Sequence, residues 1–126
     1  MNKYDELALV IASEVRVAIV RELNPAGKSY RQIEIGVEAA LRKDISDGSL
    51  TWHLEKLKGG RIIEKREDEL WYLTDVGVQI SHILRLVDHA LDIAKEKGIE
   101  IGDVEKIHPA KLAHLIFSQL IPELKA

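Results

Sequence analysis

The sequence from residue 47 to residue 63 reads Asp47-Gly48-Ser49-Leu50-Thr51-Trp52-His53-Leu54-Glu55-Lys56-Leu57-Lys58-Gly59-Gly60-Arg61-Ile62-Ile63. Its three leucines recur at the spacing of one helical face, which predicts a helix over residues 47–58. Asp47 or Ser46 would cap the first turn, because a short side-chain oxygen accepts a free backbone N–H there. Gly59-Gly60 would end the helix, since glycine adopts the left-handed conformation found at many helix C-termini.

The face opposite the leucines is polar apart from one indole. It carries Gly48, Trp52 and Glu55, flanked by Ser49, Thr51 and Lys56. A helix that presents hydroxyls, an indole and a lysine fits the DNA major groove, where such groups reach base edges. An ordinary amphipathic surface helix has the same periodicity, because the period reports burial and not function. The helix by itself is compatible with either interpretation.

Two further pieces of sequence follow this helix at a characteristic spacing. Gly60-Arg61-Ile62-Ile63 comes directly after it, and Trp71-Tyr72-Leu73-Thr74-Asp75-Val76-Gly77 comes next. Together with Thr51-Trp52-His53-Leu54-Glu55-Lys56-Leu57, they resemble the winged helix-turn-helix transcription regulators of the ArsR-like branch, over roughly residues 5–80. The resemblance implies a mainly α fold with a small β-hairpin wing. It also implies a long C-terminal dimerisation helix, as in dimeric members of the family.

Length and composition limit the remaining possibilities. The chain has 126 residues, of which 46% are hydrophobic, enough for one buried core. We expect a DNA-binding domain over residues 1–76 and a helical dimerisation extension over residues 77–126. There is no cysteine, which excludes disulfides, thiolate metal sites and cysteine nucleophiles and fits a cytoplasmic protein. No apolar run approaches the length that spans a bilayer, so no membrane partner is expected.

Charge is unevenly distributed along the chain. The formal net charge is −3, which by itself disfavours nucleic-acid binding, since phosphate contacts supply most non-specific affinity. Residues 42–66 nevertheless hold seven Lys or Arg and four Asp or Glu, a net charge of +3. Because distribution matters more than the total, this segment is the one expected to face DNA.

The segment before residue 47 predicts two helices. Residues 5–23 form the first, interrupted near Ser13, and Asn24-Pro25-Ala26-Gly27 stops it. Ser29-Tyr30-Arg31-Gln32 has the pattern of a capping box and begins the second. The spacing from Ser29 to the next helix is longer than in the family. Either the second helix runs to about Lys43, or the turn at residues 44–46 is enlarged.

Residues 61–66 and 70–74 predict the two strands of a hairpin. Trp71 and Leu73 would point inward and Tyr72 outward. The tip of the hairpin is Glu67-Asp68-Glu69. Phosphates would repel three acidic residues, whereas minor grooves attract arginine. We therefore expect the wing tip to stay out of the groove.

Residues 77–97 predict a helix of roughly 30 Å, capped by Thr74. A second apolar helix is expected between Pro109 and Pro122. The long helix has little polar surface, so a second subunit is expected to cover part of it. Its near-heptad seam, the expected dimer interface, comprises Ile80, Ile83, Leu84, Val87, Leu91 and Ala94. A second stripe comprises His82, Leu86, His89 and Ile93, and the polar strip comprises Ser81, Arg85, Asp88, Asp92, Lys95 and Glu96.

The histidines and carboxylates of the C-terminal half raise a metal-sensor alternative. His82, His89, His108 and His114 could act with Asp88 and Asp92. Related regulators place Asp and His two residues apart on this helix, whereas Asp88 and His89 are adjacent and point in different directions. We therefore expect no metal and no cofactor. No catalytic constellation is present either, so no enzyme activity is expected.

The combined hypothesis is a homodimeric transcription regulator that binds double-stranded DNA through the helix at residues 47–58. His53 would pack at the edge of the core, and Trp52 would lie at the centre of the outward face. A winged-helix protein-interaction module and an effector- or metal-responsive regulator are the alternatives. The expected DNA contacts are Ser29, Tyr30, Arg31, Arg42, Lys43, Ser49, Thr51, Trp52, Lys56, Lys58, Lys65 and Arg66.

Overall fold

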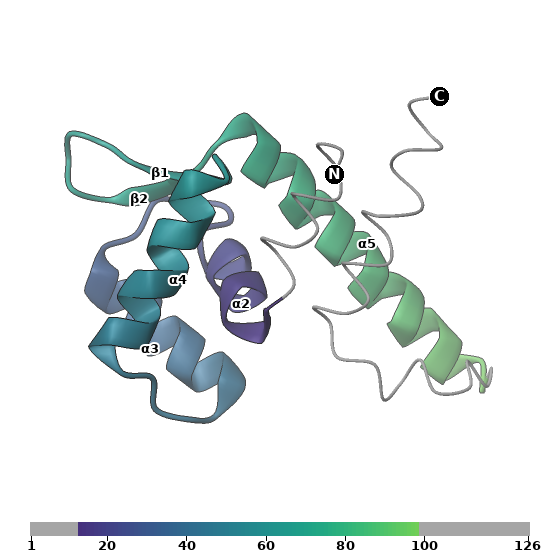
Figure 1. Cartoon of the computed structure of the whole chain (residues 1–126). Coiled ribbons are helices and arrows are strands. Elements are labelled where there is room, and N and C mark those ends of the chain that lie inside the picture. Colours follow the sequence, from purple (N-terminus) through teal and green to yellow (C-terminus); the bar gives the residue numbers. More distant parts are fainter. Residues whose placement is uncertain (1–12, 99–126) are drawn as a thin grey trace, which may run out of the picture.

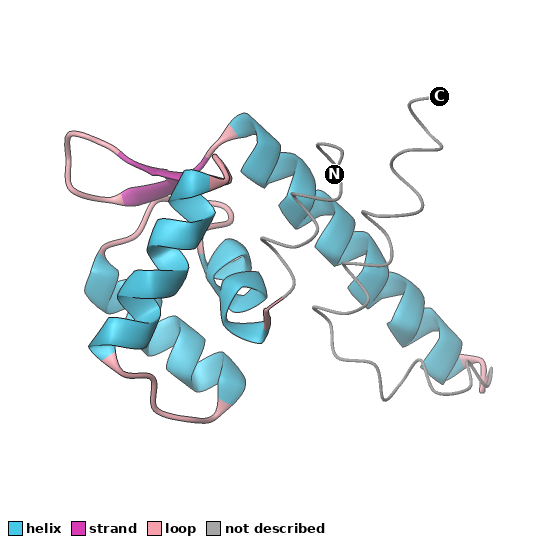
Figure 2. Ribbon diagram, in the orientation of Figure 1, coloured by secondary structure: helices cyan, strands magenta, loops and turns pink. Residues whose placement is uncertain are grey.

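The computed structural model describes residues 13–98. Within that range it contains helices α2, α3, α4 and α5 and one antiparallel pair of strands, β1 and β2 (Figures 1 and 2). The expected mainly helical fold with a small hairpin is confirmed. The predictions for residues 5–12 and for the helix between residues 109 and 122 lie outside the described residues.

Helix α2 (Glu14–Glu22) begins after Ser13, where an interruption was expected, and α3 (Tyr30–Leu41) begins at its expected cap, Ser29. The side chain of Ser13 accepts a hydrogen bond from the backbone of Arg16 at 3.4 Å, which accounts for the interruption expected there. Ser29 and Gln32 cap α3 reciprocally, with bonds of 3.2 and 2.9 Å. Both sequence signals therefore mark true helix starts.

The connection from α3 to α4 is an enlarged turn and not an extended helix. Helix α3 ends at Leu41, and Arg42 takes a left-handed conformation with φ 55°. The turn is anchored to the core, because Ile45 is buried and its N–H donates to Glu38 Oε2 at 2.8 Å. The long spacing between the two helices is therefore due to an enlarged turn and not to a helix that continues to Lys43.

Helix α4 (Asp47–Gly59) is capped by Ser46, whose side chain accepts a hydrogen bond from the backbone of Ser49. The expectation that a glycine would be left-handed at its end is wrong. Gly60 has φ −80°, and the left-handed residue is Arg61 with φ 60°. Backbone bonds from Ile62 to Leu57 and from Arg61 to Lys58, both 3.0 Å, close a Schellman motif around Arg61.

Strands β1 (Ile63–Lys65) and β2 (Trp71–Leu73) pair with Ile63 opposite Leu73. Trp71 and Leu73 are buried and Tyr72 is half-exposed, as the alternation predicted. Trp71 also exchanges two backbone hydrogen bonds, of 2.8 and 3.0 Å, with Lys28. The hairpin is thus joined to the segment before α3 as well as to itself.

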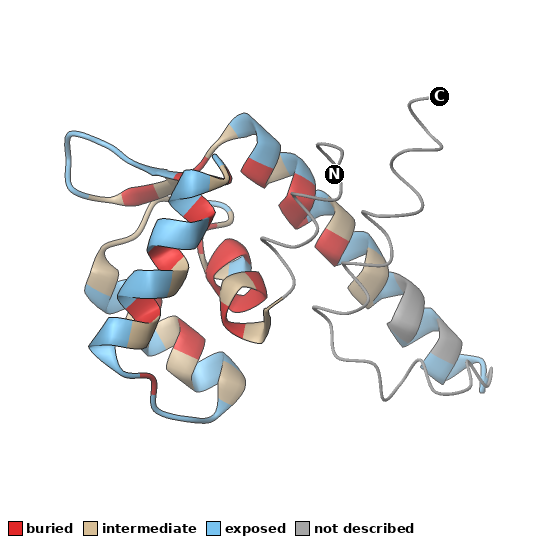
Figure 3. Ribbon diagram, in the orientation of Figure 1, coloured by how far each residue is buried: buried red, intermediate tan, exposed pale blue. Residues whose placement is uncertain are grey.

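Helix α5 (Asp75–Glu96) begins two residues earlier than expected, with Thr74 as its cap. Ile80 and Leu84 belong to the same core as α2, α3 and α4, while Figure 3 shows the far end of the helix extending away from that core. Ser81, placed in the polar strip by the sequence, is buried instead. Its hydroxyl donates to the carbonyl of Val78 at 2.7 Å, which satisfies it without solvent.

A compact junction connects the hairpin to α5. The Thr74 hydroxyl lies 2.7 Å from the Arg61 carbonyl and 3.1 Å from that of Ile62, and it also accepts from the N–H of Gly77. A side chain at Gly77 would meet the Ile62 carbonyl oxygen at 2.2 Å. The Thr-x-x-Gly spacing therefore has a local physical reason. The threonine connects the hairpin to the start of α5 by hydrogen bonds, and the glycine leaves room for the Ile62 carbonyl next to the helix.

Candidate nucleic-acid interface

Helix α4 separates an apolar inner face from a polar outer face. Leu50, Leu54 and Leu57 are at most 1% exposed. Trp52 on the opposite side is 53% exposed, so no loop of the described residues covers it. The expected orientation of the helix is confirmed. Its exposed outer side chains are Thr51, Trp52, Glu55, Lys56 and Lys58, while Ser49 is half-buried.

Trp52 lies among cationic and aromatic groups. The Arg16 guanidinium carbon, from α2, is 5.7 Å from the indole centroid, and the Lys56 Nζ is 5.3 Å from it. The ring of His53 meets the indole edge-on with centroids 4.9 Å apart. Cations at these distances are attracted by the negative face of the ring, so the indole helps to hold both in place.

His53 is half-buried behind Trp52, as the packing interpretation predicted. Its Nδ1 is buried and has no hydrogen-bond partner. Burial lowers the pKa of His53, and the nearby charge of Arg16 lowers it further. A neutral imidazole is therefore favoured at neutral pH, and the buried Nδ1 cannot serve as a phosphate contact.

The start of α3 is joined to the start of α4. The Tyr30 hydroxyl lies 3.2 Å from Asp47 Oδ1 and 3.3 Å from the Asp47 carbonyl oxygen. Burial raises the pKa of Tyr30, and the hydrogen bond to Asp47 also raises it. The hydroxyl of Ser29 is engaged in capping. Both side chains, expected as DNA contacts, thus already have structural partners, and the contact of Tyr30 with Asp47 brings the two helix N-termini together.

Most cations expected at the interface already have a carboxylate partner. Lys65 is 3.2 Å from Glu69 and Arg66 is 2.9 Å from Glu64. The other ion pairs of this kind are Arg31 with Glu34 and Lys43 with Glu14. Arg42, Lys56 and Lys58 make no ion pair with the residues at 13–98. Because exposed pairs are individually weak, this pairing reduces the availability of the four cations to phosphate but does not abolish it.

The hairpin tip keeps its negative charge. Tyr72 donates a hydrogen bond to Asp68, and this bond, together with one from the backbone of Leu70, lowers the pKa of Asp68. The same contact raises the pKa of Tyr72. Glu67 and Glu69 are exposed beside them. The tip is therefore unsuited to a minor groove, in agreement with the sequence-based expectation.

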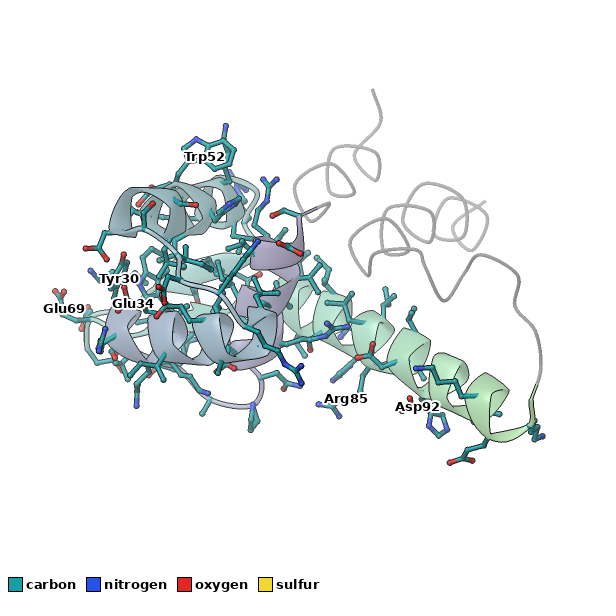
Figure 4. All side chains as sticks on the ribbon, turned by 90° about the horizontal axis from the view of Figure 1, so that it is seen from below. Tyr30, Glu34, Trp52, Glu69, Arg85 and Asp92 are labelled. Atoms are coloured by element: carbon teal, nitrogen blue, oxygen red, sulfur yellow. The ribbon has the colours of Figure 1, made fainter. Side chains whose placement is uncertain are left out.

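Figure 4 shows that Trp52 and Tyr30, both expected as DNA contacts, lie at different parts of the molecule. Trp52 projects from the top edge of that view, whereas Tyr30, Glu34 and Glu69 lie together at its left end. The first side has the cations Arg16 and Lys56 over an indole. The second has cations that are paired with carboxylates. An anionic ligand would accordingly be favoured on the Trp52 side.

Helix α5 offers a partly different surface from the one expected for a dimer. Ile80 and Leu84 are only 3% and 2% exposed, so they cannot contact a second subunit: they pack in the chain's own core. Ile83 and Val87 are half-buried, and the side chains of Leu91 and Ala94 lie outside the description. The second stripe is exposed instead, with Leu86 at 68% and Ile93 at 37%. A hollow of about 410 Å³ is lined by His82, Arg85, Leu86 and His89.

The metal-sensor alternative finds little geometric basis in α5. Asp88 is held by Arg21 through two bonds of 2.8 and 3.0 Å. Among residues 13–98, no three His, Asp or Glu side chains form a group that could hold a metal. His108 and His114 lie outside the described residues.

Arg16 is the one outer residue that sequence reasoning missed, because residues 5–23 were interpreted as scaffold. One signal was available. Arg16 follows the Ser13 cap by three residues, where the positive end of the helix dipole disfavours a cation. A cation in the first turn of a helix is unfavourable for the helix itself, so its position can indicate a role outside the helix.

No helix among the described residues is both long and apolar enough to cross a membrane. No family model, curated protein or solved structure matches the chain.

Proposed function

We propose that the chain is a winged helix-turn-helix regulator of transcription that binds double-stranded DNA as a homodimer. The observation that carries this proposal is the two-sided character of α4: three leucines are buried inward, and Thr51, Trp52 and Lys56 are exposed outward. Helices α3 and α4 would form the helix-turn-helix, with the hairpin as the wing. The resemblance to the ArsR-like branch supports the same assignment.

In this mechanism the outer face of α4 enters the major groove. Hydroxyl and amine groups such as those of Thr51 and Lys56 can reach base edges there, and an indole can contact a thymine methyl group. Arg42 and Lys58, which have no ion pair among the described residues, would hold phosphates. The acidic hairpin tip would stay outside the minor groove.

The enlarged turn between α3 and α4 is compatible with this docking. The Tyr30–Asp47 contact keeps the two helix N-termini together, despite the additional residues between the helices. Helix N-termini favour anions, so the start of α3 would approach the DNA backbone alongside α4. Arg31, 74% exposed at its side chain, would contact phosphate after release from Glu34.

The homodimer would form through the exposed stripe of α5. Leu86, at 68%, is the most exposed large apolar side chain of this helix among the described residues, and Ile93, at 37%, lies two helical turns further along. A two-fold axis there would present two α4 helices to half-sites about one helical turn apart. Light scattering on Leu86→Gln, with Arg85→Gln as control, tests this: we expect a monomer for the first and a dimer for the second.

The proposal is tested by titrating a labelled duplex from upstream of the protein's own gene at several salt concentrations, following anisotropy and tryptophan fluorescence. We expect tight binding that weakens steeply with salt, because neutralised phosphates release counterions. We also expect Trp52 emission to change. Absence of binding to this duplex and to random DNA at low salt would contradict the proposal.

A winged-helix protein-interaction module is the second candidate. The acidic tip and the four paired cations favour it, since both reduce the positive potential available to DNA. An outward Trp52 would serve a protein partner equally well. The salt dependence of binding distinguishes the two, because protein contacts do not release condensed counterions from DNA.

A further inference from the structure

Arg16 is a partly buried cation whose charge no carboxylate of the described residues neutralises. Its Nε is buried and has no hydrogen-bond partner among the described residues. No carboxylate of the described residues forms an ion pair with it. Burial lowers the pKa of Arg16 from its ordinary value, yet an arginine stays charged in proteins. Because a partly buried charge without a partner is costly, a site of this kind is suited to binding an anion.

The surroundings of Arg16 define the geometry of such a site. Arg16 and Lys56 lie at 5.7 and 5.3 Å from the same indole centroid, and the Trp52 ring is 53% exposed. The indole restricts the guanidinium, while the burial of Nε directs any ligand to the terminal nitrogens. A guanidinium of this kind offers two parallel N–H groups to the oxygens of one phosphate.

The other charges around Trp52 are mixed, because the exposed carboxylate of Glu55 lies on the same face of α4. Arg21, the next arginine of α2, is fully engaged by Asp88. The carboxylates Glu34 and Glu69 lie at the left end of Figure 4, below Trp52, which projects from the upper edge. The Trp52 side therefore combines two cations that have no carboxylate partner among the described residues with one exposed carboxylate, Glu55.

We propose that Arg16, with Trp52 and Lys56, forms a binding site for a backbone phosphate of DNA, so that α2 belongs to the DNA-binding surface. This inference rests on the proposed function and deepens it. The phosphate would bind beside the outer face of α4, at the flank of the groove that α4 enters. A phosphate fits better than a base edge, because the site has two cations and no acceptor among them.

The test compares Arg16→Met with Arg21→Met on the full chain, by duplex titration over a range of salt. Methionine keeps the length and the apolar stem of arginine but removes the charge. For Arg16→Met we expect about tenfold weaker binding, equal for the specific and a random duplex, as for loss of one phosphate contact. The slope of log affinity against log salt should become shallower by about 0.9. Arg21→Met should keep the wild-type slope.

Thermal unfolding separates a binding role from a structural one. Replacing a partly buried, unpaired charge by an apolar group is often neutral or stabilising. We therefore expect Arg16→Met to unfold at or above the wild-type temperature while binding DNA more weakly. A markedly lower unfolding temperature would show a structural role and overturn the inference. Arg16→Lys, which keeps the charge, should restore the salt slope.

Three other outcomes of the titrations would overturn the phosphate site at Arg16. Wild-type binding with an unchanged slope for Arg16→Met would overturn this inference and leave the proposed function standing. If the wild-type chain bound no duplex, both would fail. Quenching of Trp52 by poly-glutamate without any DNA binding, lost in Arg16→Met, would assign the site to an acidic protein partner and overturn the phosphate assignment.

Discussion

The outer side of α4 and the hairpin each carry two cations among the expected DNA contacts but hold them differently. On the hairpin, Lys65 and Arg66 are paired with Glu69 and Glu64. On α4, neither Lys56 nor Lys58 has a carboxylate partner among the described residues, and Lys56 lies over an exposed indole. Their neighbours therefore leave the cations of α4 more available to a ligand than those of the hairpin.

The hairpin and the outer face of α4 also differ in how they contact the rest of the molecule. The hairpin is bonded to Lys28 on one side and, through Thr74, to the start of α5 on the other. Among the described residues, the outer side chains of α4 meet other elements only at Trp52, which contacts Arg16, and at Thr51, which contacts Tyr30. We infer that the hairpin serves mainly to hold the fold together, whereas the outer face of α4 is available for binding. Each prediction below tests one side of this division.

The largest effect is expected at the junction of the hairpin with α5. In Gly77→Ala, the new methyl group would meet the Ile62 carbonyl oxygen at 2.2 Å, and backbone cannot move aside cheaply. We expect a loss of about 1–3 kcal/mol in the free energy of unfolding, the usual range for overpacking. Urea denaturation followed by circular dichroism measures this loss.

Gly59→Ala is the matched control for that variant. An added methyl group at Gly59 has no atom within 4 Å, and alanine is favoured over glycine inside a helix by up to about 1 kcal/mol. We expect unchanged or increased stability. Equal losses in the two variants would mean that the junction is no tighter than the helix end, and the structural role of the hairpin would lose its basis.

The second prediction concerns DNA affinity. Lys56→Ala should weaken DNA binding about tenfold, equivalent to one charged contact of about 1.4 kcal/mol. Lys65→Ala should weaken it less than about twofold, because its ion pair with Glu69 already competes for the charge. Neither change should alter folding, since both side chains are exposed. Anisotropy titrations at one salt concentration suffice, and equal losses would contradict the proposed division.

Much of this arrangement could be predicted from local sequence. The leucine stripe of α4, the Ser29–Gln32 capping box and the Trp71–Leu73 alternation all appear as expected, because each depends on residues close in the chain. The left-handed residue after α4 was misplaced by one position. The preference for glycine pointed to Gly60, whereas the hydrogen bonds of the motif require Arg61.

The features that could not be predicted depend on contacts between distant segments. Arg16 reaches Trp52 from another helix, and no periodicity within α2 indicates that contact. Ile80 and Leu84 fit a dimer seam as well as a core, so only the packing of α5 decides between them. Which cation is paired likewise depends on side-chain geometry, as with Lys65 and Glu69.

The third prediction converts the hairpin into a more available cationic surface. The double variant Glu64→Gln/Glu69→Gln removes the partners of Lys65 and Arg66. We expect DNA affinity to rise about threefold, in line with the weak energy of exposed ion pairs. The variant Asp92→Asn/Glu96→Gln makes the same change of charge on the far part of α5. An equal gain in that control would show an effect of net charge alone.

The smallest effect is expected from pH, on the α4 side. Since the pKa of His53 is lowered in the folded state, the unfolded chain takes up the proton first as pH falls. The stability that neutral His53 contributes is present above its ordinary pKa of about 6.5 and declines as pH falls toward its folded pKa. The unfolding temperature of the wild-type chain should therefore fall from pH 7.5 to 5.5 by more than that of His53→Gln.

The same window leaves the hairpin tip unchanged, because the hydrogen bond from Tyr72 lowers the pKa of Asp68 and keeps it ionised. Bound DNA should reduce the pH effect, since a phosphate beside Arg16 offsets the positive charge that opposes protonation of His53. Unfolding measured with and without duplex at both pH values gives this difference. A pH dependence identical in the wild-type chain and His53→Gln would place its origin away from α4.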